Sequence, residues 1–454
     1  MSVIAVILTL ILAVLSYKIE KRLYNPMTLF CGIWALVISF AALHLYGMNE
    51  VSDDAYSIII LGIICFTLGC YVALSIRKRF RIGHIGERQN RNFSEDYRIN
   101  YPIVYLVGVI VLFFLIVETV VAFFAYRNGI QMNELRSSMM GYSTTGYASG
   151  MAFLRQGPFA LIYSFVFLPG FYSLLLVTSV DVIIGQRNRI LIAMSIIAVA
   201  LKNYAEGSRM CLTHLVLYFI LLLLIYKRGI LSKKAKKWIK RAVIVIIVGF
   251  LIVSNIRFSE SEKTMAQQLY MYFTCAIPLF DHWLEFERST GIYTYGAVSL
   301  LGLLRFPCNI LKMIGITLPT VILNNANEIA VNWDSFVNIG PRLNYNSYVT
   351  LFMYFYKDAG VLGVMAGSFL FGFASSRVYR RLKQEVANGK APLRLTYVYV
   401  LFGCFLIQSY IRFFFSRTDY AMILYYALIF FKRNKGKSLD DSRDGKAVIQ
   451  KREE

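Results

Sequence analysis

The sequence predicts an all-α membrane protein, a polytopic transmembrane bundle of about eleven spans with one large, partly helical external loop. Apolar runs of about 15 to 25 residues recur along the 454-residue chain, and such a run can cross the roughly 30 Å of hydrocarbon in a bilayer. The connections between the runs are alternately rich and poor in Lys and Arg, which orients each span. Hydrophobic residues make up 57% of the chain and charged residues only 16%.

The apolar runs place the spans in order along the chain. The first run lacks a basic segment before it and a convincing cleavage site after it, so residues 1–16 are expected to form a span and not a cleaved signal peptide. The predicted spans are residues 2–17, 27–46, 57–75, 101–126, 159–180, 190–204, 211–226, 242–256, 361–376, 395–411 and 420–431.

Every second connection is strongly basic. Together these connections carry 34 of the 48 Lys and Arg residues, and the positive-inside rule assigns them to the cytoplasm. The N-terminus is then periplasmic and the C-terminus cytoplasmic. The basic connections are residues 18–26, 76–100, 181–189, 227–241, 377–394 and the tail 432–454.

The other connections are predicted to be external. Residues 257–360 are far longer than an ordinary connection, and their aromatic and aliphatic stretches at 270–284 and 298–304 predict helices on the outer leaflet. A twelfth span results if residues 301–323 cross or re-enter the bilayer. The chain is thus divided into eight transmembrane helices in residues 1–256, the periplasmic loop 257–360, C-terminal spans in 361–431 and a disordered basic tail, 432–454.

Composition also excludes several classes of function. The net charge is +22, but the Lys and Arg residues that produce it lie between the predicted spans and not on one face of a soluble domain. This distribution argues against nucleic acid as a partner. There is no phosphate-binding glycine loop, no H-E-x-x-H, no G-x-S-x-G and no paired C-x-x-C. With four His in all, a His-based metal site is not expected. Of the seven cysteines, only Cys275 and Cys308 lie where a disulfide is plausible.

Four external arginines remain as the candidates for chemistry. A guanidinium is charged in any environment and offers a planar fork of donors, which suits phosphate oxygens. At the outer edge of a bilayer this indicates a lipid-linked diphosphate, although each Arg could instead snorkel to lipid headgroups. The candidates are Arg209, Arg342, Arg412 and Arg417, with Arg127, Arg136 and Arg155 as weaker ones.

Several side chains could act as a general base. Asp281 and His282 lie in an aromatic stretch, PLFDHWLEF, where desolvation would favour proton transfer near neutral pH. Other carboxylates are Asp419, Asp334 and Asp358; Glu285 and Glu287 would point to different faces of a helix. Aromatic residues of the external segment could stack on sugars or form an interfacial belt: Trp283, Tyr293, Tyr295, Trp333, Tyr345 and Tyr348.

Three segments resemble a known family. Residues 346–372, NSYVTLFMYFYKDAGVLGVMAGSFLFG, resemble the entry to a late span of bacterial oligosaccharide repeat-unit polymerases, the Wzy-type O-antigen polymerases. Here Ala359 replaces the aromatic residue that precedes the glycine in that family. The GSR at 207–209 and the R-x-D at 417–419 are similar to the family's external turns. The resemblance extends to the topology, but its motifs are short.

The resemblance implies a GT-C-like glycosyltransferase of the bacterial inner membrane. Such an enzyme transfers the growing glycan from undecaprenyl diphosphate onto the non-reducing end of the next lipid-linked repeat unit at the periplasmic face. It implies diphosphate binding by Arg209, Arg342, Arg412 and Arg417, and a base among Asp281, His282 and Asp419. No cofactor or metal is required, and a flippase and a chain-length regulator are possible partners.

Two other classes remain open. An O-antigen ligase has the same architecture and hands the finished glycan to a lipid A core. A flippase or other transporter usually has two similar halves, short loops and ionisable residues lining a cavity. In this chain the halves are not visible, and Glu118 and Lys202 are the main charges within spans.

Overall fold

The computed structural model describes residues 1–80, 97–131, 134–135, 157–207, 209–226 and 264–433, together with residues 241, 244 and 248. Within these ranges the protein is mostly helical, and the four short strands form two separate two-stranded sheets. The expected span at 242–256 falls almost entirely outside the described residues, as does the expected tail beyond residue 433.

Six helices of the described residues are long and apolar enough to cross a membrane. Two shorter apolar helices, α2 (Pro26–Ala41) and α17 (Leu393–Ile407), accompany them. These findings agree with an all-α membrane protein, whereas the count of eleven spans stays a prediction. The six segments are α1 (Ser2–Glu20), residues Asp53–Ile76 of α3 (Asp53–Phe80), α4 (Tyr101–Arg127), Phe159–Ile184, α10 (Arg209–Tyr226) and α16 (Thr350–Ala387).

Other expected spans correspond to different elements. The segment Phe159–Ile184 combines α7 (Gly157–Ile162), the π-helical turn η3 (Tyr163–Phe167) and α8 (Leu168–Ile184). Two further helices match predicted spans but are more polar or shorter: α9 (Arg189–Glu206) and α18 (Thr418–Ile429).

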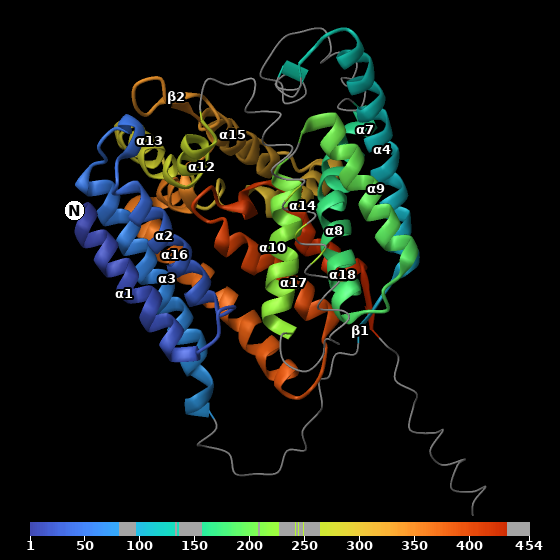
Figure 1. Ribbon diagram of the computed structural model, residues 1–454, viewed down its shortest axis with the longest axis horizontal. Helices are drawn as coiled ribbons and strands as arrows, with labels where there is room; N and C mark the ends of the chain where they lie inside the picture. The colour runs from blue at the N-terminus through green and yellow to red at the C-terminus, as the bar shows by residue number, and fades with distance from the viewer. Residues whose placement is uncertain are drawn as a thin grey trace, which may run out of the picture.

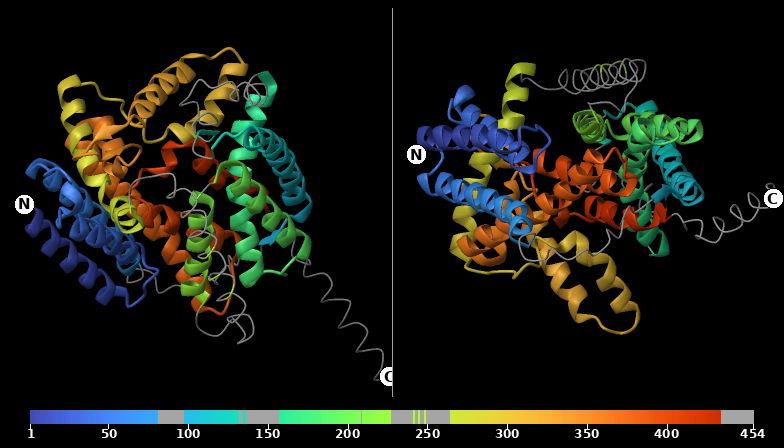
Figure 2. Two further views of the ribbon diagram at one scale, coloured as in Figure 1. Left: turned by 45° about the horizontal axis from the view of Figure 1, so that its top comes forward. Right: turned by 90° about the horizontal axis from the view of Figure 1, so that it is seen from below.

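The helices form two groups with the C-terminal helices between them. Figure 1 shows α1, α2 and α3 on one side and α4, α8 and α9 on the other, and Figure 2 shows α16 to α18 in the middle. Helix α16 packs along α3 at close range, because Gly69 and Gly372 bring their Cα atoms against the carbonyl oxygens of Phe369 and Phe66. A larger residue at either glycine would force the two backbones apart.

The expected external loop is a layer of helices at one end of the bundle. Where the sequence left open a further span or re-entrant segment at 301–323, the chain forms two helices joined by a turn after Met313, and 13 residues of helix are only about 20 Å long. The hairpin protrudes from the bundle (Figure 2) and ends in exposed apolar residues such as Met313 and Leu318. The layer contains η1 (Leu45–Gly47), α12 (Met265–Thr274), α13 (Ala276–Thr290), α14 (Leu301–Met313), α15 (Leu318–Asn332), β2 (Val337–Asn338) and β3 (Asn344–Tyr345).

Helix α16 begins earlier than the predicted boundary at residue 361. Its first part, Thr350 to Asp358, is buried, and the backbone then breaks at Ala359 and Gly360. The ring of Phe355 lies against Gly367, although residues twelve apart in a straight helix are separated by about 18 Å. The chain therefore folds back on itself at Gly360, whose φ of +60° suits glycine. The segment taken as the end of the loop is thus a short helix packed inside the bundle.

The opposite end of the bundle gathers the basic connections. Strand β1 (Tyr97–Ile99) pairs antiparallel with β4 (Phe431–Arg433), which joins the segment before α4 to the segment after α18. The connection between α8 and α9 and the start of α17 lie beside this pair. Segments that share a predicted side of the membrane thus lie at the same end of the fold.

Candidate functional site

Arg412 joins the turn after α17 to the long segment between α10 and α16, both of which were predicted to be external. The residue follows α17, and its guanidinium donates to Oδ1 of Asp334 at 3.3 Å and to the backbone oxygen of Ser347 at 3.1 Å. Only 12% of the Arg412 side chain and 17% of the Asp334 side chain are exposed. The pair is therefore largely screened from water, and its attraction is stronger than that of a surface ion pair.

The backbone beside Arg412 is held in an unusual conformation. Thr350 and Ser347 both have positive φ angles, of 62° and 66°, and Thr350 is β-branched. The N–H of Thr350 donates to the carbonyl of Ile411 at 3.2 Å, and that of Leu351 donates to Ser409 at 2.9 Å. Such strained positions persist where surrounding contacts fix them, and they cluster at functional sites.

Arg417 and Asp419 form a fork-to-fork pair at the start of α18. Nε and one terminal nitrogen of Arg417 donate to the two carboxylate oxygens of Asp419, at 3.1 and 3.2 Å. Asp419 lies in the first turn of α18, where the helix dipole favours a negative charge. The Asp419 carboxylate raises the pKa of Arg417 well above its ordinary value. Arg417 is 43% exposed, so its outer edge is open to a ligand.

Arg209 reaches the same end of the bundle from a different turn. Gly207 ends α9 in the left-handed conformation, which brings Arg209 to the first position of α10. The Arg209 guanidinium lies 4.8 Å from the ring centre of Tyr272 and donates to its hydroxyl. Tyr272 in turn packs against Tyr348, with ring centres 6.1 Å apart, and burial raises the pKa of Tyr348. Next to Arg209, the sulfur of Met210 accepts from Nε2 of Gln408 at 3.7 Å, which ties α10 to the end of α17.

An aromatic group containing His214 lies beneath these charges. The His214 ring stacks on Tyr420 with ring centres 5.1 Å apart and an interplanar angle of 14°. The Tyr420 hydroxyl donates to the hydroxyl of Tyr172 at 3.1 Å. Nδ1 of His214 lies 2.9 Å from the carbonyl of Met210, which can only accept, so Nδ1 carries the proton and Nε2 is an acceptor. Nε2 is buried and has no partner among the described residues.

Sequence reasoning overlooked His214 because the residue lies in an apolar run. A signal was present: on a helix, His214 comes five residues after Arg209, little more than one turn away. Its contact with Tyr420, the residue after Asp419, arises because α10 and α18 both pack against α8, and it could not be predicted from the sequence.

The Arg342 side chain forms no hydrogen bond or ion pair with a described residue, so no such bond links it to the other three arginines. It is exposed in the turn between β2 and β3, with a φ of +60°, and the neighbouring Pro341 lies about 3.5 Å from the space a Cβ on Gly47 would fill. The weaker candidate Arg127 ends α4, while Arg136 and Arg155 lie outside the described residues.

The other expected bases are placed on α13. Asp281 accepts from the backbone N–H of Ser52 at 2.8 Å and from its hydroxyl, so it anchors α13 to the start of α3. His282 is exposed and contacts the ring of Trp283. In Figure 1, α13 lies over α1 to α3, whereas Asp419 is on α18 in the central group. Asp281 and His282 are therefore not brought together with Asp419.

Further charged residues of the external layer have structural contacts. Glu287 accepts from the Lys357 ammonium and, at 2.9 Å, from Nε1 of the buried Trp333. Asp358 accepts from the hydroxyl of Thr294 at 2.6 Å and from two backbone N–H groups of the following turn. Glu285 is exposed whereas Glu287 is buried, so the two carboxylates point to different faces of α13, as a spacing of two residues on a helix predicts.

The aromatic candidates differ in their access to a sugar. Trp283 and Trp333 are buried in the core of the external layer. Tyr345 and Tyr348 are half-buried. Tyr293 and Tyr295 are exposed, and Tyr295 has 87% of its surface accessible, so these two could contact a ligand without rearrangement.

Charged residues within the predicted spans form one buried cluster. Lys202 donates to Glu206 at 2.7 Å and to Glu118 at 3.3 Å, and Glu118 also accepts from the Tyr163 hydroxyl at 3.0 Å. The cluster joins α4 to α9 and to the π-helical turn. Buried ionic groups at this depth usually face the bundle interior and pair with each other.

Within the part of the chain that the structure describes, no group of three His, Cys, Asp or Glu side chains could hold a metal ion. All seven cysteines are free and buried, so the disulfide that the sequence left plausible between Cys275 and Cys308 is not formed. Both thiols lie within helices or at their caps, in separate elements of the external layer.

No protein-family model, no curated protein and no solved structure matches this chain.

Proposed function

We propose that this chain is a GT-C-like glycosyltransferase that polymerises oligosaccharide repeat units carried on undecaprenyl diphosphate at the periplasmic face of a bacterial inner membrane. The observation that carries the proposal is the pairing of Arg412 with Asp334 and of Arg417 with Asp419 at the end of the bundle. Two guanidinium forks five residues apart suit the several oxygens of a diphosphate. The sequence motifs around 207–209, 346–372 and 417–419 point to the same chemistry.

Binding a diphosphate requires an exchange of partners. Arg412 and Arg417 are each neutralised by a carboxylate, so the incoming phosphate oxygens must replace Asp334 or Asp419. A diphosphate is a stronger partner because it brings more charge and more acceptor oxygens than one carboxylate. Arg209 would add a third cation from the neighbouring turn. Arg342, exposed on the β2–β3 turn, is left out of this proposal.

The same exchange would supply a base for the reaction. An acceptor sugar hydroxyl forms a bond to the anomeric carbon of the donor glycan, and the bond from that carbon to the diphosphate oxygen breaks. The electron pair leaves on undecaprenyl diphosphate, where the arginines stabilise the charge. The hydroxyl proton passes to a carboxylate released from its arginine, for which Asp419 and Asp334 are the candidates. Asp281, bonded to Ser52, and His282 are less suited to this role.

The proposal is tested with purified protein in lipid nanodiscs. Synthetic undecaprenyl-diphosphate-linked repeat units should be converted into a ladder of longer glycans without added nucleotide, with release of undecaprenyl diphosphate. Arg417→Lys should lose the ladder, while Arg381→Lys, an exposed residue of α16 at the opposite end, should retain it. An absolute requirement for ATP, or equal activity in Arg417→Lys, would refute the mechanism.

Deletion of the gene distinguishes the polymerase from the ligase of similar architecture. Loss of a polymerase leaves single repeat units attached to the surface acceptor, whereas loss of a ligase leaves none. The expected phenotype is the retention of single units.

A further inference from the structure

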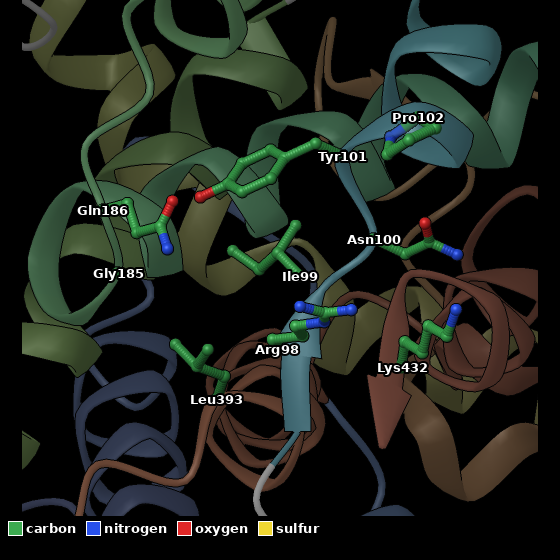
Figure 3. A pocket seen from close by; sticks show the side chains of 9 residues that line it. All are labelled: Arg98, Ile99, Asn100, Tyr101, Pro102, Gly185, Gln186, Leu393 and Lys432. Carbon is green, nitrogen blue, oxygen red and sulfur yellow. The ribbon is translucent and has the colours of Figure 1, made fainter. Parts of the chain in front are cut away.

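A cavity of about 420 Å³ lies at the end of the bundle opposite Arg412. Four segments that are distant in the sequence line it: β1 with the start of α4, the α8–α9 connection, the start of α17, and β4 (Figure 3). All four were predicted from their basic residues to face the cytoplasm. The cavity is separate from the arginine site, and the proposed reaction does not use it.

Two cations stand on one side of this cavity. In the antiparallel ladder Arg98 lies directly opposite Lys432, so their side chains emerge on the same face of the strand pair. Figure 3 shows both side chains directed toward the part of the cavity that Asn100 lines. Both are exposed, and neither forms an ion pair with a described residue. Like charges directly opposite each other repel, so an anion between them would be stabilising.

Neutral donors complete the lining. Asn100 and Gln186 present side-chain amides, and α4, 27 residues long, begins here at Tyr101, so its N-terminal dipole adds positive potential. Among the described residues, the lining contains no Asp or Glu. The nearby Asp181 is buried and already accepts three hydrogen bonds, from the Tyr101 hydroxyl at 2.7 Å and from two backbone N–H groups of the α8–α9 connection.

We propose that this cavity binds a phosphate-bearing anion, with Arg98 and Lys432 as the charged ligands. The cavity lies where apolar helices α4, α8 and α17 begin or end, which is headgroup depth for a membrane protein. A phospholipid phosphate could therefore reach it from the leaflet, and a soluble phosphate ester could reach it from the solvent. The bound group would also bridge β1 and β4, and so fix the end of α18 whose first turn holds Asp419.

The test compares two double variants with the same loss of charge. Arg98→Gln/Lys432→Gln removes the proposed ligands. Arg187→Gln/Arg433→Gln is the matched control, because Arg433 alternates to the other face of β4 and neither Arg187 nor Arg433 lines the cavity. Binding of phosphatidylglycerol and of phosphatidylcholine to the full-length protein is measured by native mass spectrometry. Inorganic phosphate and glycerol 3-phosphate are titrated separately by calorimetry.

We expect phosphatidylglycerol to bind the cavity variant about tenfold more weakly than the wild type and the control variant. Tight binding of the soluble phosphates with the same dependence on Arg98 and Lys432 would also support the site and identify a soluble ligand. Equal binding by the two double variants, whether retained or lost in both, would overturn the proposal, because the effect would then be general surface charge. A circular dichroism melt of each variant establishes that it is folded.

Discussion

A guanidinium nitrogen of Arg412 lies 3.3 Å from Oδ1 of Asp334, 78 residues earlier in the chain. The pair connects the turn after α17 to Asp334, which directly follows Trp333 at the end of α15. Since Arg412 also donates to the carbonyl of Ser347, the segment before α16 is attached at two points to the turn after α17. A ligand that competes for Arg412 would therefore loosen this layer as it binds.

Replacing Arg412 by Lys tests the guanidinium fork. Lysine keeps the charge but offers a point donor in place of a planar fork, so the loss of transition-state stabilisation should reduce turnover about 100-fold. The measurement is the rate of glycan elongation in nanodiscs, with Arg381→Lys as the control. If the two variants elongate at the same rate, Arg412 is a structural contact only.

Asp334→Asn should strengthen the binding of undecaprenyl diphosphate. The amide has no charge to compete for Arg412, so undecaprenyl diphosphate should bind about threefold to tenfold more tightly. Native mass spectrometry of the purified protein measures the affinity. Weaker binding in Asp334→Asn would show that the carboxylate helps to hold the ligand and is not its competitor.

Arg342→Lys should behave as the wild type in the elongation assay. This arginine lies in an exposed turn between β2 and β3, and its side chain has no hydrogen bond or ion pair with a described residue. A loss of activity as large as that of Arg412→Lys would show that the β2–β3 turn moves onto the site when substrate binds.

The buried pair of Lys357 and Glu287 should matter for stability. Lys357→Met leaves the Glu287 carboxylate buried without its cation, with Trp333 Nε1 and the Thr290 hydroxyl as the remaining donors, which should lower the free energy of unfolding by about 3–5 kcal/mol. Thermal unfolding in detergent measures this effect. Lys390→Met, at an exposed position after α16, is the control and should change the midpoint little. If Lys357→Met unfolds at the same temperature as the wild type, the Lys357–Glu287 ion pair makes no net contribution to stability.

The orientation in the membrane can be tested by labelling introduced cysteines. All seven native cysteines are buried, so a maleimide that cannot cross membranes should react weakly with the native protein. In intact spheroplasts Tyr295→Cys should react, while Lys390→Cys should react only after permeabilisation. The reverse pattern would place Arg412 and Arg417 in the cytoplasm and eliminate the proposed function.

Part of the candidate site was predictable from the sequence. Arg209, Arg412 and Arg417 stand out because external turns are otherwise poor in basic residues, and Asp419 is close enough to Arg417 for a local pair. Asp281 was chosen for its aromatic neighbours, yet the structure bonds it to Ser52. Local sequence gave no reason to expect that bond, because 229 residues separate the two.

The sequence by itself determined that the chain is helical and apolar enough for a membrane, because the length and spacing of apolar runs are local properties. It also predicted that the basic connections share one side, and the described parts of four of them, at β1, β4, the α8–α9 connection and the start of α17, lie at one end of the bundle. Only the tertiary structure decided that Arg412 meets Asp334, that Lys357 meets Glu287, and that the chain folds back at Gly360. These contacts join distant segments, and they depend on how helices pack and on which buried polar groups must find partners.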